Sequence, residues 1–268
     1  MLWSAGGLGI KSVDAAPLKI AFYRSAFAAV ALLLLFRPGR LPRRPSLLAA
    51  VACYAACLIT FVVATRWTTA ANAIFLQYTG VVWVLLAAPL VLHEPRQPAD
   101  AAAIAAALVG MALFFVGKLE TRGLTGDLMA LASSVLFAFL VISLRRERGE
   151  GAEAVVSFGN VFAAAILLPF VAGDLALTPR SAAWLVFLGV FQLAGAYALF
   201  VRGIRDVPAT RASLIGMLEP VANPIWVFLA LGERPSPFAI AGGAIVLIAV
   251  AWRTLASGPP AAEAAPPD

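Results

Sequence analysis

The sequence predicts an all-α integral membrane protein, a ten-span bundle of two inverted five-helix repeats. Two observations predict this class. Of the 268 residues, 62% are hydrophobic and 13% are charged, whereas soluble domains are about half apolar and a quarter charged. The stretch 208–250 also resembles the stretch 69–111 when Glu94 is aligned with Glu233. An internal repeat in so apolar a chain is typical of membrane proteins built from two similar halves.

Nine apolar segments are long enough to cross a bilayer, which takes about 20 mainly apolar residues. We place these spans at 17–36, 45–65, 70–92, 98–117, 124–144, 152–172, 181–202, 210–231 and 236–256. Residues 1–13 form part of a tenth, because a helix of that length rises about 20 Å against a core of about 30 Å. Either the natural start lies upstream, which we favour because the halves then match, or the bilayer thins around a short helix.

The repeat sets the predicted domain boundaries. We assign residues 1–117 to a first repeat with a truncated first helix and residues 118–256 to a second repeat. Because five spans is an odd number, the second repeat starts from the opposite side of the membrane and is inverted. Residues 257–268 are rich in proline and alanine, which predicts a disordered tail.

The positive net charge of +6 indicates topology rather than a nucleic-acid partner. If the C-terminus is cytoplasmic and the sides alternate, twelve arginines lie on the cytoplasmic side and seven lysines and arginines on the outer side. Basic residues are expected to favour the cytoplasmic side. We therefore predict a multi-pass protein of the bacterial inner membrane with a cytoplasmic C-terminus. Its expected partner is the lipid bilayer, and no nucleic-acid partner is expected.

No cofactor or metal is predicted. The two cysteines, Cys53 and Cys57, lie four residues apart on one helix, where small packing residues are the usual interpretation. The one histidine, His93, lies at a span end and has no partner motif for a metal or a general base. An intramembrane enzyme is therefore the least favoured class of function.

Several short motifs together resemble one family, the EamA-type transporters of the drug/metabolite transporter superfamily: Trp3-Ser4 and Ile10-Lys11, Arg24, Arg145-Arg146, and Leu218-Glu219-Pro220-Val221 before Leu231-Gly232-Glu233-Arg234. The resemblance implies ten spans, a central cavity and transport of small metabolites, often as export. The first half departs from the family pattern. It has His93-Glu94-Pro95 where the family favours Gly-Glu-Arg, and Val81 where Pro220 stands in the second half.

Polar groups within the hydrocarbon are costly, so each is a candidate for function. The spacing of Ala212, Gly216, Glu219 and Asn223 places them on one helical face. Their counterparts 139 residues earlier are Ala73, Gln77, Gly80 and Val84. If these faces meet, each helix offers a small residue opposite a polar residue of the other.

The resemblance implies that helices 1, 3, 4, 6, 8 and 9 line the cavity. Amide, acidic and aromatic side chains near mid-span on these helices are the predicted substrate-binding residues, since binding cavities combine apolar walls with a few polar groups. They are Trp3, Tyr54, Gln77, Tyr78, Gln192, Glu219 and Asn223.

Glu219 is the deepest acid in the chain, about 14 Å from either end of its span at 1.5 Å per residue. It is predicted to couple a proton or to bind a substrate ammonium, or else to be a structural acid beside the kink expected at Pro220. Arg24 is either its partner or a side chain that extends to the outer interface. Lys11 either meets a substrate carboxylate or marks the interface.

Glu94 and Glu233 begin short turns and are the predicted gate or turn residues. A carboxylate in such a turn can cap the helix that follows, and this role is favoured over substrate contact.

The expected function is that of a secondary transporter for a small-molecule substrate, an amino acid or a related metabolite, with export across the inner membrane by alternating access. Coupling to protons is open, and so is a monomer or a homodimer. A lipid-carrier flippase is the alternative, and it would need a cavity that opens sideways between helices.

Overall fold

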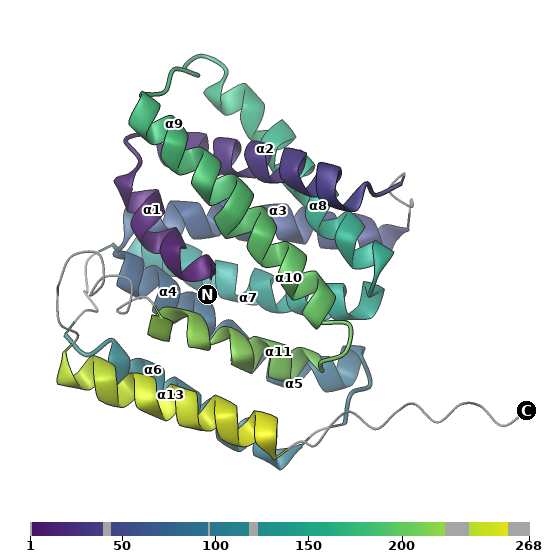
Figure 1. The fold of residues 1–268 in the computed structure, drawn as a ribbon, viewed down its shortest axis with the longest axis vertical. Coiled ribbons are helices and arrows are strands. Elements are labelled where there is room, and N and C mark those ends of the chain that lie inside the picture. Colours follow the sequence, from purple (N-terminus) through teal and green to yellow (C-terminus); the bar gives the residue numbers. More distant parts are fainter. Residues whose placement is uncertain (1, 40–43, 96, 118–122, 223–235, 257–268) are drawn as a thin grey trace, which may run out of the picture.

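The computed structural model describes residues 2–39, 44–95, 97–117, 123–222 and 236–256, and these residues form helices and no strands. The elements in chain order are η1 (Trp3–Ala5), α1 (Gly6–Ser12), α2 (Pro17–Phe36), α3 (Pro45–Trp67), α4 (Ala70–Tyr78), α5 (Gly80–Val91), α6 (Pro98–Phe114), α7 (Leu124–Glu147), α8 (Glu150–Val171), α9 (Pro179–Val186), the π-helical η2 (Phe187–Gly195), α10 (Ala196–Gly203), α11 (Ala209–Gly216) and α13 (Pro237–Leu255) (Figure 1). Asn223, Glu233 and the tail at 257–268 lie outside the described residues.

Within the described residues, seven helical stretches are long and apolar enough to cross a membrane: Pro17–Phe36, Pro45–Trp67, Ala70–Val91, Leu124–Glu147, Glu150–Val171, Pro179–Gly203 and Pro237–Leu255. The predicted span 98–117 is shorter than expected, because its helix ends at Phe114 after 17 residues. The predicted span 210–231 is described as far as residue 222. The described part of the chain is thus all-helical, and most of its long helices have the length and composition of membrane spans.

Helix starts follow local rules that the sequence carries. Five helices, α2, α3, α6, α9 and α13, begin at a proline, which lacks an N–H that would have no partner in the first turn. Thr69, Thr178 and Ser236 cap α4, α9 and α13, since each hydroxyl oxygen accepts a hydrogen bond from a backbone N–H three residues on.

The most extensive packing between helices joins α3 to α7, α2 to α8 and α6 to α13. Figure 1 shows α6 and α13 side by side along one edge of the bundle. Their backbones meet at two glycines. A Cβ atom at Gly242 would lie 2.4 Å from the carbonyl oxygen of Gly110, so this close approach requires glycine. These glycines therefore serve packing within the chain.

Charged side chains gather at two ends of the bundle. At one, called here the basic end, Arg145, Arg205, Arg211 and Arg253 bind acidic groups. At the opposite end, Lys19 pairs with Asp174 at 2.9 Å. Lys11 donates to the Thr68 carbonyl at 2.9 Å, and Arg66 donates to the carbonyls of Val13 and Ala15. The arginines of the basic end are among those that the sequence assigned to the cytoplasmic side.

Candidate functional site

A cavity of about 90 Å³ lies among η1, α1, α2, α3, α4, α7, η2, α10 and the helical residues 218–222. One water molecule needs roughly 10–15 Å³ of such space, so the cavity could hold several waters or a small solute. Its polar lining residues come from both predicted repeats. They are Ser4, Arg24, Cys57, Gln77, Gln192 and Glu219.

Aromatic rings form much of the remaining wall: Trp3, Phe61, Tyr78, Phe115, Phe137 and Tyr197. The ring of Trp3 packs edge-on against Tyr197, with centroids 5.0 Å apart, and contacts Phe137 in the same way at 6.5 Å. Apolar walls with a few polar groups are the usual composition of a small-molecule site.

The π-helical segment η2 brings Gln192 to the cavity. Single π-turns within α-helices frequently occur at functional sites. Here the segment lies close against α2, because a Cβ atom at Gly189 would stand 2.6 Å from the Cβ of Phe27 and 2.9 Å from the Arg24 carbonyl oxygen. The glycine lets η2 approach α2 closely enough for Gln192 to reach the Arg24 side chain.

A continuous chain of hydrogen bonds crosses the site. Arg24 Nη2 donates to Gln192 Oε1 at 2.8 Å. Gln192 Nε2 donates to the carbonyl oxygen of Trp3 at 3.2 Å. The backbone N–H of Trp3 donates to Glu219 Oε1 at 3.2 Å. This polar chain, Arg24–Gln192–Trp3–Glu219, has a cation at one end and an acid at the other.

Arg24 does not extend to the membrane interface, as one interpretation of the sequence allowed. Its exposed fraction is 3%, and its contact is with Gln192 rather than directly with Glu219. Its Nε atom is buried and has no hydrogen-bond partner among the described residues. The sequence analysis expected Arg24 to pair with Glu219 or to extend to the outer interface, and did not include it among the cavity residues. Its position within the second span was the one sequence feature that could have indicated a place at the cavity.

Gln77 lines the cavity, as predicted, and its Nε2 donates to Ser133 Oγ at 2.9 Å. The predicted opposition of small and polar residues is not observed. A Cβ atom at Gly80 would lie 2.7 Å from the Ser134 carbonyl oxygen, so this glycine serves close packing on α7 instead of facing Glu219. Gly216 has Tyr78 as its nearest neighbour, 4.0 Å from an added Cβ.

One of the predicted substrate-binding residues, Tyr54, is not among the residues that line the cavity. Tyr54 is fully buried behind the lining, with its ring 4.9 Å from that of Tyr197. Its hydroxyl accepts a hydrogen bond from Asn160 Nδ2 at 2.8 Å. Asn223 is outside the described residues. Lys11 is not among the cavity residues and is held by the Thr68 carbonyl.

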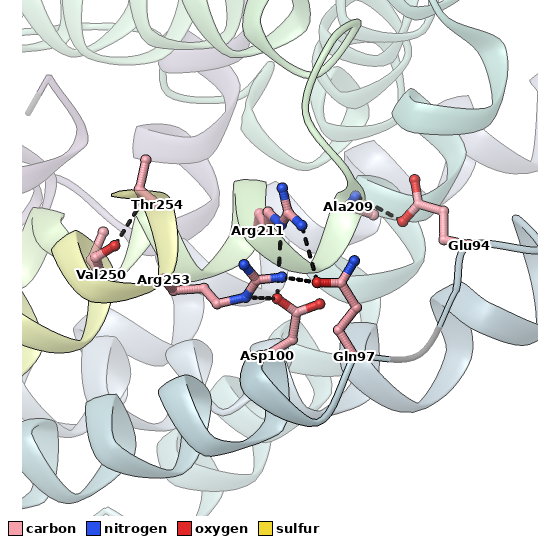
Figure 2. Close-up of polar contacts among 8 residues, drawn as sticks. All are labelled: Glu94, Gln97, Asp100, Ala209, Arg211, Val250, Arg253 and Thr254. Atoms are coloured by element: carbon pink, nitrogen blue, oxygen red, sulfur yellow. Dashed lines mark hydrogen bonds and ion pairs between the residues drawn. The ribbon is translucent and has the colours of Figure 1, made fainter. Parts of the chain in front are cut away.

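Glu94 caps a helix, but a different one from the helix predicted. Its Oε2 accepts a hydrogen bond from the backbone N–H of Ala209 at 3.1 Å, at the first residue of α11 (Figure 2). Its Oε1 accepts a hydrogen bond from Arg145 Nε at 2.9 Å. The helix that follows Glu94 in sequence, α6, begins after Gln97 instead. The prediction missed this because a cap can join segments far apart in the chain.

The basic end also holds a network around Asp100 (Figure 2). Asp100 pairs with Arg253, and its Oδ1 lies 3.8 Å from Arg211 Nε. Gln97 Oε1 accepts from both of these arginines. A second cavity of about 310 Å³ adjoins the network. The charged residues of this second cavity form ion pairs at one end of the bundle. The first cavity lies among the central helices and is therefore the candidate site.

Known proteins match the chain along nearly its whole length. The model of the EamA-like transporter family matches residues 1–116 and 124–255. The chain belongs to the EamA-like transporter family. This makes it a membrane transporter.

Relatives of this EamA-like chain bear the same kind of name. An uncharacterized transporter of Archaeoglobus fulgidus is 25% identical over 91% of this chain and 89% of its own length. The uncharacterized transporter YwfM of Bacillus subtilis is 29% identical over 53% of this chain and 50% of its own length. One solved protein crystal structure has the same fold, with a TM-score of 0.79, 17% identity, and coverage of 95% of this chain and 93% of that one.

Proposed function

We propose that the chain is a secondary transporter that exports small metabolites, amino acids or related compounds, across the bacterial inner membrane by alternating access. One observation carries this proposal. The cavity lies where both predicted halves contribute side chains, and its polar chain ends in Arg24 on one side and Glu219 on the other. A site with both a cation and an acid suits a solute that carries both charges.

Alternating access is supported by how the helices pair. We propose ten spans in two inverted repeats, residues 1–117 and 118–256, with the C-terminus in the cytoplasm. In this scheme α2 corresponds to α8 and α6 to α13, and each helix packs against its own counterpart. In the same scheme α3 corresponds to the span that contains η2, and α8 corresponds to α2. The contact of α3 with α8 therefore has its equivalent in the contact of η2 with α2. Such exchange symmetry is expected of two halves related by a pseudo-two-fold axis.

Glu219 is our candidate for proton coupling. It is 7% exposed, it lines the cavity, and its Oε1 is bonded to the same Trp3 whose carbonyl oxygen holds Gln192. Loading or unloading a proton at this carboxyl group would therefore act on the polar chain that reaches Arg24. Ionisable groups inside membrane proteins commonly mark such pathways.

Counterflow in proteoliposomes tests the proposal. Vesicles loaded with unlabelled amino acids are diluted into a labelled mixture, with and without a pH gradient, and the accumulated label is measured. We expect accumulation by the wild type, and loss of its response to the pH gradient in Glu219→Gln. The control is Asp174→Asn, which neutralises an exposed acid at the bundle end. Unchanged proton dependence in Glu219→Gln would contradict the coupling role, and movement of a fluorescent lipid in place of amino acids would favour the flippase.

A further inference from the structure

Arg24 is a buried cation that the protein leaves incompletely bound. Its exposed fraction is 3%. Its described hydrogen bond goes to Gln192, a neutral amide, and its buried Nε has no partner among the described residues. An unsatisfied donor on a buried charged group is costly. Arg24 is also one of the residues that line the cavity, and a buried cation left in this state beside a cavity is the arrangement expected where a ligand supplies the missing acceptor.

The ligand group that suits this donor is a carboxylate. A guanidinium presents its N–H groups in a planar fork that matches the two oxygens of a carboxylate, and such charge-assisted pairs are about twice as strong as neutral ones. Gln192 fixes the fork, because its Oε1 holds Arg24 Nη2 while its Nε2 is held by the Trp3 carbonyl. Gly6 leaves room for that amide, since a Cβ atom there would lie 2.8 Å from Gln192 Nε2.

We propose that Arg24 binds the carboxylate group of the transported solute, with Gln192 as the positioning residue that aims the guanidinium. This inference rests on the proposed function and names the chemical class of its substrate, a small organic acid or amino acid. A solute with the same side chain but no carboxylate would leave the Arg24 Nε atom without its acceptor and would bind more weakly.

The test compares solutes that differ in one group. Alanine, valine, leucine and phenylalanine are each titrated beside their carboxamide, their decarboxylated amine and their deaminated acid. Binding to the purified full chain in detergent is followed by tryptophan fluorescence, because Trp3 lines the cavity. We expect amino acids and deaminated acids to bind about 10- to 100-fold more tightly than the matching amides and amines, the usual loss for a charge-assisted hydrogen bond.

Gln192→Glu is the most informative variant. It gives Arg24 a carboxylate from the protein, so the variant is not expected to unfold, but the site for the solute carboxylate is then occupied. We expect acid binding to weaken about 10- to 100-fold. Arg24→Lys keeps the charge without the fork, and acid binding should weaken there as well. Gln97→Glu is the matched control, since it makes the same change beside the arginines of the basic end, and acid binding should stay at the wild-type level.

Equal binding of acids, amides and amines by the wild type, or wild-type acid binding by Gln192→Glu, would overturn the assignment. Counterflow of the same solutes separates this failure from that of the proposed function. Exchange of amines or amides without preference for acids would keep the transporter and remove the role of Arg24. Absence of exchange for every solute of the set would overturn the proposed function itself.

Discussion

Arg24 and Arg253 are equally buried, each with an exposed fraction of 3%, yet the protein surrounds them differently. Arg253, at the basic end, binds the carboxylate of Asp100 and the amide oxygen of Gln97. Arg24, at the central cavity, receives the amide oxygen of Gln192 and no carboxylate in its described contacts. Both are arginines near one amide, and the difference between them is the acid.

The difference separates a structural cation from one available to a ligand. A buried charge is tolerated when a partner of opposite charge and further hydrogen bonds compensate its lost hydration. Asp100 supplies that compensation at the basic end. The described contacts of Arg24 include no such acid, and under our proposal a solute in the cavity that Arg24 lines would supply it. Removing the acidic partner of Arg253 should therefore mainly lower the stability of the protein. Changes at Arg24 and Gln192 should mainly weaken the binding of the solute.

The largest effect is expected from Asp100→Ala. Removal of this carboxylate leaves Arg253 buried beside a neutral amide, and breaking a buried ion pair costs about 3–5 kcal/mol. Unfolding by sodium dodecyl sulfate in mixed micelles measures the loss. The corresponding truncation at the cavity, Gln192→Ala, removes a neutral partner and should cost about 1–3 kcal/mol. Equal losses in the two variants would mean that the two arginines are held alike.

Arg24→Met should separate binding from stability. The change removes a buried cation that has no acidic partner in the described contacts, so the free energy of unfolding should stay the same or rise. Binding of amino acids should weaken about 10- to 100-fold, as estimated for a lost charge-assisted hydrogen bond. Arg253→Met is the comparison and should lower stability, because it takes the cation from Asp100. A strongly destabilised Arg24→Met would show that Arg24 holds the fold.

Gly6→Ala should disturb Gln192 without touching any charge. The added Cβ would meet Gln192 Nε2 at 2.8 Å, so the amide must shift and the hydrogen bond to Arg24 should lengthen. We expect acid binding to weaken a few-fold, on the order of 1 kcal/mol for one perturbed hydrogen bond. The same titrations against amides provide the control, because amide binding should not change. A parallel loss for acids and amides would instead indicate a general narrowing of the cavity.

The smallest effect is expected at the opposite end, where a third buried cation has an exposed partner. Lys19 is 7% exposed and bonds to Asp174 and the Ala176 carbonyl. The hydrogen bond from Lys19 lowers the pKa of the Asp174 carboxyl group. The stabilisation is therefore present above about pH 4, the ordinary aspartate pKa, and is lost as the pH falls through the lowered value.

Asp174→Asn should therefore melt slightly below the wild type at neutral pH. The difference should shrink in acid as the wild-type carboxyl group takes up its proton. Thermal unfolding at a series of pH values checks this. A gap that widens in acid would reverse the sign and contradict the pairing.

Much of the fold could be predicted because it follows local rules. The predicted spans followed from the length of each apolar run, which is written in a short stretch of sequence, and seven helical stretches of that kind are present in the described residues. Gln77, Tyr78, Gln192 and Glu219 were expected at the cavity from their depth and chemistry, and they lie around it. What failed depended on contacts between distant segments.

Arg24 shows this failure most clearly. Its neighbour Gln192 lies in a π-helical segment, and the residue spacings of an ordinary α-helix do not reveal such a change of register. Gly80 was expected to face Glu219, but the approach of α7 occupies its surface. Glu94 was expected to cap the helix that follows, yet the helix it caps begins at Ala209. Each of these outcomes is decided by tertiary packing.

The central claim is that Gln192 orients the Arg24 guanidinium so that it can bind a solute carboxylate. A structure of the protein with a bound amino acid or deaminated acid from the titration set tests it most directly. We expect a carboxylate oxygen within about 2.7–2.9 Å of Arg24 Nε, the usual length of such a charge-assisted bond, with Gln192 still bound to Nη2. A carboxylate bound elsewhere in the cavity, with Arg24 Nε still lacking a partner, would contradict the claim.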